Sequence, residues 1–159
     1  MEFGISFRKA TIDDLESIVA LLADDVLGAT RERYESPLPN SYQEAFYAID
    51  SDSNNELIVA CMGNKIIGIQ QITFTPYITY QGGWRATIEG VRVSASVRGQ
   101  GVGKQLIQWA VERAKERGCH LIQLTTDKER KEARRFYEQL GFRATHEGMK
   151  LKLSFKSNI

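Results

Sequence analysis

Of the 159 residues in this chain, 42% are hydrophobic and 26% are charged, a composition that is typical of folded proteins and excludes a disordered chain. The 21 basic residues are balanced by 20 acidic ones, so the net charge of +1 lacks the strong positive excess of most nucleic-acid-binding proteins. We therefore expect no nucleic-acid partner. We also expect a single domain over residues 1–159, because the chain is too short for two ordinary domains.

Cysteine usage and hydropathy exclude two further classes. Cys61 and Cys119 stand far apart in apolar runs, and neither belongs to a CxxC pair, so we expect no disulfide framework and no metal site. No apolar run approaches the ~20 residues of a membrane span. Residues 1–9 also lack the basic and apolar regions of a signal peptide. We therefore expect a cytoplasmic protein with no membrane partner.

The front of the chain predicts a strand followed by two helices. Residues 5–8 are typical of a strand, and Thr11 can cap a helix that carries acidic residues in its first turn, where negative charge is favourable. Pro37 and Pro39 separate this helix from a weaker one at about residues 42–49. The loop between the two helices can overhang a substrate site.

The middle of the chain is extended. Residues 56–62 and 65–75 are two strand-like runs joined by Gly63-Asn64, a pair typical of a tight turn, and they predict a β-hairpin. A second turn at Gly82-Gly83 leads into a further strand over residues 84–93.

The last third alternates helix and strand. Apolar residues recur with a helical period from Val102 until Gly118 ends the helix, and residues 119–126 then form a short apolar strand. Another helix ends at Gly141. Residues 142–144 and 149–155 are predicted to be the final strands.

The strongest chemical signal is the run Arg98-Gly99-Gln100-Gly101-Val102-Gly103, which lies between a predicted strand and a predicted helix. Glycines let the backbone approach a diphosphate closely, and the amides and dipole of the helix start favour its negative charge. Two nucleotide motifs fail on spacing, because Lys104 and Arg98 stand where the dinucleotide and P-loop motifs respectively need glycine. A flexible surface turn is the alternative for this run taken alone.

Together with Val91-Arg92-Val93, this run resembles the acetyl-CoA signature of the GNAT superfamily, usually written Gln/Arg-x-x-Gly-x-Gly/Ala. The resemblance extends to residues 134–142, which look like the second helix of the family, and covers nearly the whole chain. It implies an α/β fold of the α+β type, with a central mixed, mostly antiparallel sheet of about seven strands flanked by about four helices. It also implies acetyl-CoA as co-substrate, bound by Val91, Arg92, Val93, Arg98, Gly99, Gln100, Gly101, Val102, Gly103 and Lys104.

The resemblance implies two catalytic residues. Glu89 matches a glutamate that often acts as general base, which is useful because a lysine-like amine has a pKa near ~10.4 and must lose its proton before it attacks. Alternatively, Glu89 is a solvated strand residue or pairs with Arg92. Tyr137 matches the tyrosine that protonates the departing thiolate, although its place in a helical apolar stripe also allows a packing role alone.

Three further positions are singled out by the same resemblance. The backbone of Val91 and Val93 matches positions that bind the oxyanion and the pantetheine arm. The neighbouring Gly90 indicates a bulge or a close backbone approach, with an ordinary irregularity of the strand as the alternative. Arg130 stands where many relatives carry asparagine, so that contact to pantetheine is absent. His146 lies at a predicted turn and is not assigned a catalytic role.

The sequence thus predicts an N-acetyltransferase that moves acetyl directly from acetyl-CoA to the primary amine of a small molecule. Acetylation of a protein N-terminus or lysine, and a non-catalytic CoA-binding sensor, remain alternatives. The resemblance places acceptor specificity mainly in the first helices and the loop at residues 34–42, but their composition does not identify the amine. The apolar stretch over residues 74–84 makes a homodimer a hypothesis.

Overall fold

A computed structural model describes residues 4–154 of the chain. Its strands are β1 Ile5–Lys9, β2 Asn55–Met62, β3 Lys65–Pro76, β4 Trp84–Val93 and β5 Cys119–Leu124. Its α-helices are α1 Leu15–Ala23, α2 Val26–Arg31, α3 Asn40–Asp50, α4 Thr79–Gly82, α5 Val102–Glu116 and α6 Lys131–Gln139, and the short 3-10 turns are η1 Ile12–Asp14 and η2 Ala95–Val97. Contacts divide the chain into two compact units, Met1–Leu124 and Thr125–Ile159.

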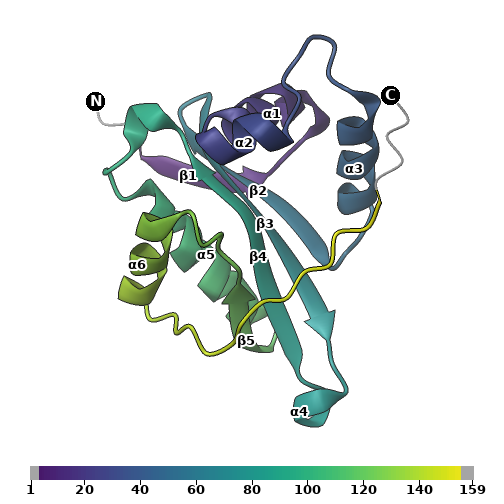
Figure 1. Cartoon of the computed structure of the whole chain (residues 1–159), viewed down its shortest axis with the longest axis vertical. Coiled ribbons are helices and arrows are strands. Elements are labelled where there is room, and N and C mark those ends of the chain that lie inside the picture. Colours follow the sequence, from purple (N-terminus) through teal and green to yellow (C-terminus); the bar gives the residue numbers. More distant parts are fainter. Residues whose placement is uncertain (1–3, 155–159) are drawn as a thin grey trace. The chain divides into compact units, whose positions relative to one another are not determined.

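The first unit is built on one five-stranded sheet in the order β1-β2-β3-β4-β5 (Figure 1). The first four strands pair antiparallel with their neighbours, whereas β4 and β5 pair parallel. A parallel pair needs a crossover connection, and α5 supplies it. The mixed, mostly antiparallel sheet expected from the sequence is confirmed.

Helices cover both faces of this sheet because successive residues of a strand point to opposite faces. Val59 packs in a cluster with residues of α1 and α3, such as Ile18 and Phe46. The next residue, Ala60, packs in a second cluster with Leu106 of α5. The apolar faces of α1 and α5 therefore pack in two separate cores.

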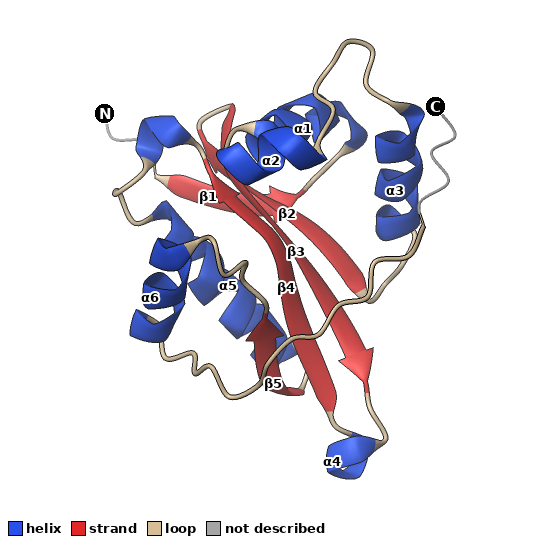
Figure 2. Ribbon diagram, in the orientation of Figure 1, coloured by secondary structure: helices blue, strands red, loops and turns tan. Residues whose placement is uncertain are grey.

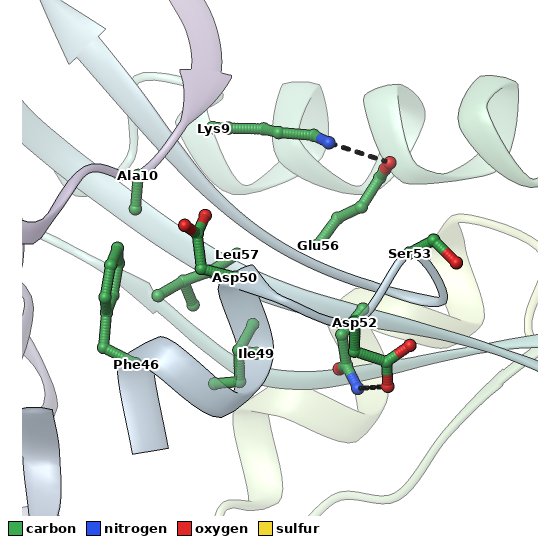
Figure 3. Close-up of a pocket in the computed structure, with 10 residues that line it drawn as sticks. Lys9, Ala10, Phe46, Ile49, Asp50, Asp52, Ser53, Glu56 and Leu57 are labelled. Carbon is green, nitrogen blue, oxygen red and sulfur yellow. Dashed lines mark hydrogen bonds and ion pairs between the residues drawn. The ribbon is translucent and has the colours of Figure 1, made fainter. Parts of the chain in front are cut away.

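A buried ion cluster joins β2 to α5. Glu56 is only 3% exposed, and the guanidinium of Arg113 donates to both of its carboxylate oxygens at 2.8–3.3 Å. Lys9 and Arg117 lie 3.8 and 3.9 Å from the same carboxylate. Hydrogen bonds from Arg113, stronger than the opposing effect of burial, hold the pKa of Glu56 below its usual range. Both Lys9 and Glu56 line a small cavity of about 70 Å³. Figure 3 shows the ion pair between these two side chains as a dashed line.

The expectation of about seven strands is wrong for the described residues, which contain five. Phe142 was expected to begin a strand, but its amide donates to the carbonyl of Tyr137 at the end of α6. Met149, Leu151 and Leu153 alternate with lysines as a strand would, yet they are 95%, 87% and 82% exposed and belong to no strand of the described chain. An alternating pattern permits a strand, but a strand also needs a partner ladder. Residue 155 of the expected last strand lies outside the described residues.

The expectation of about four helices is also wrong, because the described residues contain six. The additional ones are the short α2 and α4, and α4 includes Tyr80 and Gln81 at φ values of 53° and 60°. Elements of one turn contain too few residues for a periodic apolar stripe, so sequence periodicity does not detect them. Figure 2 shows α4 at the tip of the hairpin formed by β3 and β4.

Candidate active site

A bulge in β4 shapes the region around Glu89. In the β3–β4 register Gln71 faces Glu89 and Ile69 faces Arg92, so β4 has one more residue than β3 between these two pairs. Gly90 lies in the extra segment at a φ of 63°, a left-handed conformation that favours glycine. The bulge expected from the sequence at Gly90 is confirmed.

Beyond the bulge, β4 separates from β5. Their parallel pairing runs from Trp84 with Cys119 to Ile88 with Leu124, and the later residues of β4 pair only with β3 in the register of the described chain. The amide of Ser94 donates to Ile67 of β3 at 2.8 Å. Because backbone groups alternate in direction along a strand, the amide of Val93 points to the other, open edge. This edge is the one expected to pair with the pantetheine arm.

The glycine-rich run forms a loop that leads into α5. Gly99 and Gly101 have φ values of 79° and 81°, and a Cβ built on either residue meets no atom within 4 Å. The backbone is therefore open to an approaching group. The first amides of α5, from Val102 onward, have no intrahelical acceptor and point out of the helix start, where the dipole favours an anion. Arg98 and Lys104 are both exposed, so the loop has the chemistry of a diphosphate site.

A cavity of about 160 Å³ adjoins Glu89 and Gly90. Its walls come from α1, α3 and the sheet, and they are largely apolar. The apolar lining residues are Leu15, Ile18, Val19, Leu22, Ala45, Phe46, Ile49, Leu57 and Ile69. The cavity is thus an extension of the core between α1, α3 and the sheet, with the bulge of β4 at one side.

Three polar side chains complete the lining of this cavity. Glu89 is exposed and lines the cavity beside the bulge of β4. Gln71, opposite Glu89, donates from Nε2 to Oδ1 of Asn55 at 2.9 Å. The hydroxyl of Tyr42 donates to Glu32 at 2.8 Å, and burial together with that carboxylate raises the pKa of Tyr42 above its ordinary value. The predicted involvement of residues 34–42 is supported by Tyr42 alone among these lining residues.

Arg92 links the bulge to α2. Its Nε lies 3.5 Å from the carboxylate of Asp25, and its Nη1 donates to the carbonyl of Val91 at 2.8 Å. Asp25 also caps α2 by accepting from the amide of Gly28. The guanidinium of Arg92 therefore ties the strand to the helix that follows α1.

Tyr137 belongs to the second unit, where it packs in α6. Its ring makes edge contacts with Phe136 and Phe142, at centroid distances of 5.1 and 5.9 Å. The ring is half-buried, so the packing role that the sequence allowed is present. Arg130 occupies the N-cap of α6, and exposed His146 lies 2.6 Å from the hydroxyl of Thr145.

The cysteines are poorly suited to nucleophilic catalysis. Cys61 is buried in the core, and burial raises the pKa of the Cys119 thiol, which lowers its thiolate fraction. The part of the chain from residue 4 to 154 contains no group of three or more His, Cys, Asp or Glu side chains arranged to hold a metal ion. Over the same residues, no helix has the length and apolar character needed to cross a membrane.

Sequence reasoning missed Gln71 and the apolar walls of the cavity. Gln71 carries no motif, and only the register between β3 and β4 places it opposite Glu89. The wall residues Leu15, Ile18, Val19 and Leu22 recur with a helical period, but this periodicity also predicts ordinary core. The sequence offers one signal for a functional role of Gln71, because Gln70 and Gln71 interrupt the apolar residues of β3.

The sequence profile of the Acetyltransferase (GNAT) family matches residues 23–142 of this chain. The aminoalkylphosphonate N-acetyltransferase of Salmonella typhimurium is 28% identical over 139 residues, which cover 87% of this chain and 85% of that protein.

Two solved structures have the same fold. A protein of Bacillus halodurans C-125 described as a transcriptional regulator is 66% identical, with a TM-score of 0.92 over 94% of this chain and 100% of that chain. A predicted acetyltransferase of Clostridium acetobutylicum, solved with acetyl-CoA, is 24% identical with a TM-score of 0.73 over 94% and 96% of the two chains.

Proposed function

This chain belongs to the acetyltransferase (GNAT) family and is an acetyl-CoA-dependent N-acetyltransferase, and we propose that it acetylates the primary amine of a small molecule by direct transfer. The proposal rests on three features that lie close together along the chain in the first unit. An open strand edge at Val93, a glycine-rich loop before α5 and a cavity beside Glu89 all lie along or directly after β4.

The donor side of the reaction uses backbone more than side chains. Gly99, Gly101 and the first amides of α5 fit a diphosphate, with Arg98 and Lys104 adding positive charge. The open edge at Val91 and Val93 fits the amides of a pantetheine arm by strand-like pairing. Acetyl-CoA supplies an activated acyl group as a thioester. The remaining residues of the predicted site, Arg92, Gln100, Val102 and Gly103, shape the same strand and loop.

On the acceptor side, Glu89 is proposed as the general base. An ammonium group must lose a proton before its nitrogen attacks a carbonyl carbon, and the Glu89 carboxylate can accept that proton directly or through one water. The carboxylate lines the cavity at the bulge, where an amine bound in the cavity meets the strand.

Tyr137 is proposed as the general acid. When the carbon–sulfur bond breaks, the departing thiolate needs a proton, and a phenol hydroxyl can donate it. The aromatic contacts of Tyr137 with Phe136 and Phe142 hold its ring in a defined orientation. No covalent enzyme intermediate is needed, which agrees with the buried position of Cys61 and the raised pKa of the Cys119 thiol.

A small-molecule acceptor is favoured over a protein acceptor for two reasons. The cavity of about 160 Å³ has walls on several sides, whereas a peptide needs an extended groove. The Salmonella relative is named for a small aminoalkyl compound. We also propose that residues 1–159 form one domain, that the protein is cytoplasmic, and that it has no metal, nucleic-acid or membrane partner. The family match at residues 23–142, which spans both units, supports the single domain.

A CoA-binding regulator is the second candidate, because the Bacillus halodurans protein is described as a transcriptional regulator. Such a protein would keep the glycine-rich loop but would need neither Glu89 nor Tyr137 for chemistry. Turnover therefore separates the two functions.

The test begins with isothermal titration of acetyl-CoA, CoA and ATP, followed by thiol-release assays with a panel of primary amines. Binding of the two CoA compounds but not of ATP, together with thiol release by at least one amine, is the expected result. Binding of CoA compounds without thiol release from any amine points to the regulator, and absence of CoA binding contradicts both candidates.

A further inference from the structure

We propose that the acceptor carries its primary amine on a compact apolar group and bears no phosphate, phosphonate or other anion. This inference rests on the proposed function, in which the cavity beside Glu89 receives the acceptor. It goes further by naming the chemical class of the amine from the side chains that line the cavity.

The cavity walls are apolar and firmly held. Leu15, Ile18 and Leu22 project from α1, Phe46 from α3 and Leu57 from β2. Ile18 and Phe46 are only 3% and 5% exposed, because they also belong to the core cluster between the helices and the sheet. A ligand group that packs against these side chains removes apolar surface from water and finds no polar partner among them.

Among the described residues, none that lines the cavity is a cation. The ionisable side chains of this lining are Glu89 and Tyr42, and lysine, arginine and histidine are absent from it over residues 4–154. Nearby guanidinium groups have carboxylate partners, since Arg92 lies 3.5 Å from Asp25 and Arg33 lies 2.9 Å from Glu35. A phosphonate in this space would lose its hydration, gain no opposite charge and approach the Glu89 carboxylate.

The polar side of the cavity suits an ammonium group. Glu89 and Gln71 face one another across β3 and β4, and both line the cavity. Because Nε2 of Gln71 donates to Asn55, the oxygen of this amide is the atom left to accept from a ligand. The carboxylate and the amide oxygen together favour a cationic amine at the bulge and orient it towards the open edge of β4.

The size of the cavity limits the apolar group. Its volume of about 160 Å³ is close to that of an apolar protein cavity of about 150 Å³ that holds a benzene molecule. An arylalkylamine or a branched alkylamine therefore matches both the volume and the polarity. The Salmonella relative, by its name, acts on aminoalkylphosphonates, so the two proteins differ in the acceptor class inferred here.

Binding tests this inference without requiring turnover. Isothermal titration of the full chain with phenethylamine and with 2-aminoethylphosphonate compares two primary amines that differ in the group attached to the ethyl chain. We expect phenethylamine to bind at least about tenfold more tightly, which is the usual scale for apolar pocket discrimination. Equal or tighter binding of the phosphonate, or no binding of either amine, overturns the inference.

A matched pair of variants locates the binding in the cavity. Ala45→Phe adds a ring at the cavity wall, whereas Ala48→Phe adds the same ring to an exposed position of α3 outside the lining. We expect phenethylamine affinity to fall about tenfold in Ala45→Phe and to stay unchanged in Ala48→Phe, with acetyl-CoA affinity retained in both. An unchanged affinity in Ala45→Phe overturns the inference.

Thiol release then separates this inference from the proposed function. One outcome is that phenethylamine binds in the cavity but neither it nor any other amine of the panel releases thiol. This result contradicts the acetyltransfer proposal and leaves the ligand class supported. Preferential turnover of 2-aminoethylphosphonate supports acetyl transfer to a small amine and contradicts the ligand class.

Discussion

Glu89 lies at the point where the regular ladder of β4 ends. It pairs with Gln71 in the β3–β4 register, and the bulge begins at the next residue, Gly90, at a φ of 63°. A residue with a Cβ at position 90 would be strained at this φ, whatever space surrounds it. Both Glu89 and Gly90 line the cavity, so the proposed base stands directly beside a backbone position that favours glycine.

Replacing Glu89 by glutamine is expected to reduce kcat/KM by about 10²- to 10⁴-fold near neutral pH, because the variant has no base to deprotonate the ammonium. The loss of kcat/KM should become smaller as the pH rises towards the amine pKa of about 10.4, because the free amine becomes abundant there without a catalytic base. Thiol-release kinetics over a pH series measure both effects.

Glu44→Gln is the matched control for this experiment, since Glu44 is an exposed glutamate of α3 outside the cavity lining. Its pH profile should follow that of the wild type. A Glu89→Gln profile that also follows the wild type at every pH removes Glu89 from the mechanism.

Replacing Tyr137 by phenylalanine separates proton donation from packing. The ring contacts with Phe136 and Phe142 are retained, so the melting temperature should change little, while kcat should fall about 10- to 1000-fold through loss of the hydroxyl proton. Thermal unfolding and steady-state kinetics of the same preparation measure the two quantities. Tyr47→Phe, at an exposed tyrosine of α3, should change neither, and normal kcat in Tyr137→Phe would leave that residue a packing role only.

At the scale of elements, β2 and α5 are joined by charge as well as by apolar packing. Glu56 sits on β2 at 3% exposure, and Arg113 reaches it from α5 with a bidentate contact. A buried carboxylate without such a partner would destabilise the fold, so the two elements depend on one another.

Glu56→Gln is expected to lower the free energy of unfolding by about 3 kcal/mol at pH 7, because it leaves a partly buried guanidinium without its carboxylate. The folded-state pKa of Glu56 is lowered, so the ionised pair stabilises the protein above the usual glutamate pKa of about 4.3 and this stability is lost as the pH falls through the lower folded value. The difference between wild type and variant should therefore shrink below about pH 4. Urea unfolding at several pH values measures it.

Glu112→Gln is the control on the same helix, because Glu112 pairs with Lys115 at 3.0 Å while both side chains are about two-thirds exposed. An exposed pair contributes about 0–1 kcal/mol, so this variant should unfold almost as the wild type does. Equal stability losses in the two variants would show that burial of Glu56 has no special effect.

At the scale of the whole molecule, the hairpin tip is a candidate contact surface between copies. Ile78 and Tyr80 are 96% and 73% exposed, and the guanidinium of Arg85 lies 4.4 Å from the ring centroid of Tyr77. Phe74, which the sequence grouped with them, is 1% exposed and belongs to the interior. The proposed surface is therefore smaller than the apolar stretch of residues 74–84.

Light scattering at micromolar concentration is expected to give twice the chain mass of 18.0 kDa. Ile78→Asp should shift the mass towards one chain, because a charge buried in an apolar contact loses its hydration. Val26→Asp, at a residue of α2 that is 85% exposed, should leave the mass unchanged. A wild-type mass of a single chain would rule out the dimer under these conditions.

The sequence by itself determined the kinds of elements and the chemistry of one loop. Periodicity and turn residues predicted β4, α5 and the hairpin of β2 and β3 closely, because helix and strand patterns arise from neighbours along the chain. The glycines of residues 99–103 indicated a diphosphate loop for the same reason, since glycine spacing and the following helix start are local features.

The tertiary structure decided what those elements enclose. The cavity unites side chains of α1, α3 and three strands, and Gln71 meets Glu89 only through the β3–β4 register. The alternating residues 149–153 predicted a strand, but strand formation depends on a partner that no local pattern specifies. Registers, partners and cavities result from packing between residues distant in sequence, and therefore the acceptor class could be inferred only after the chain was seen folded.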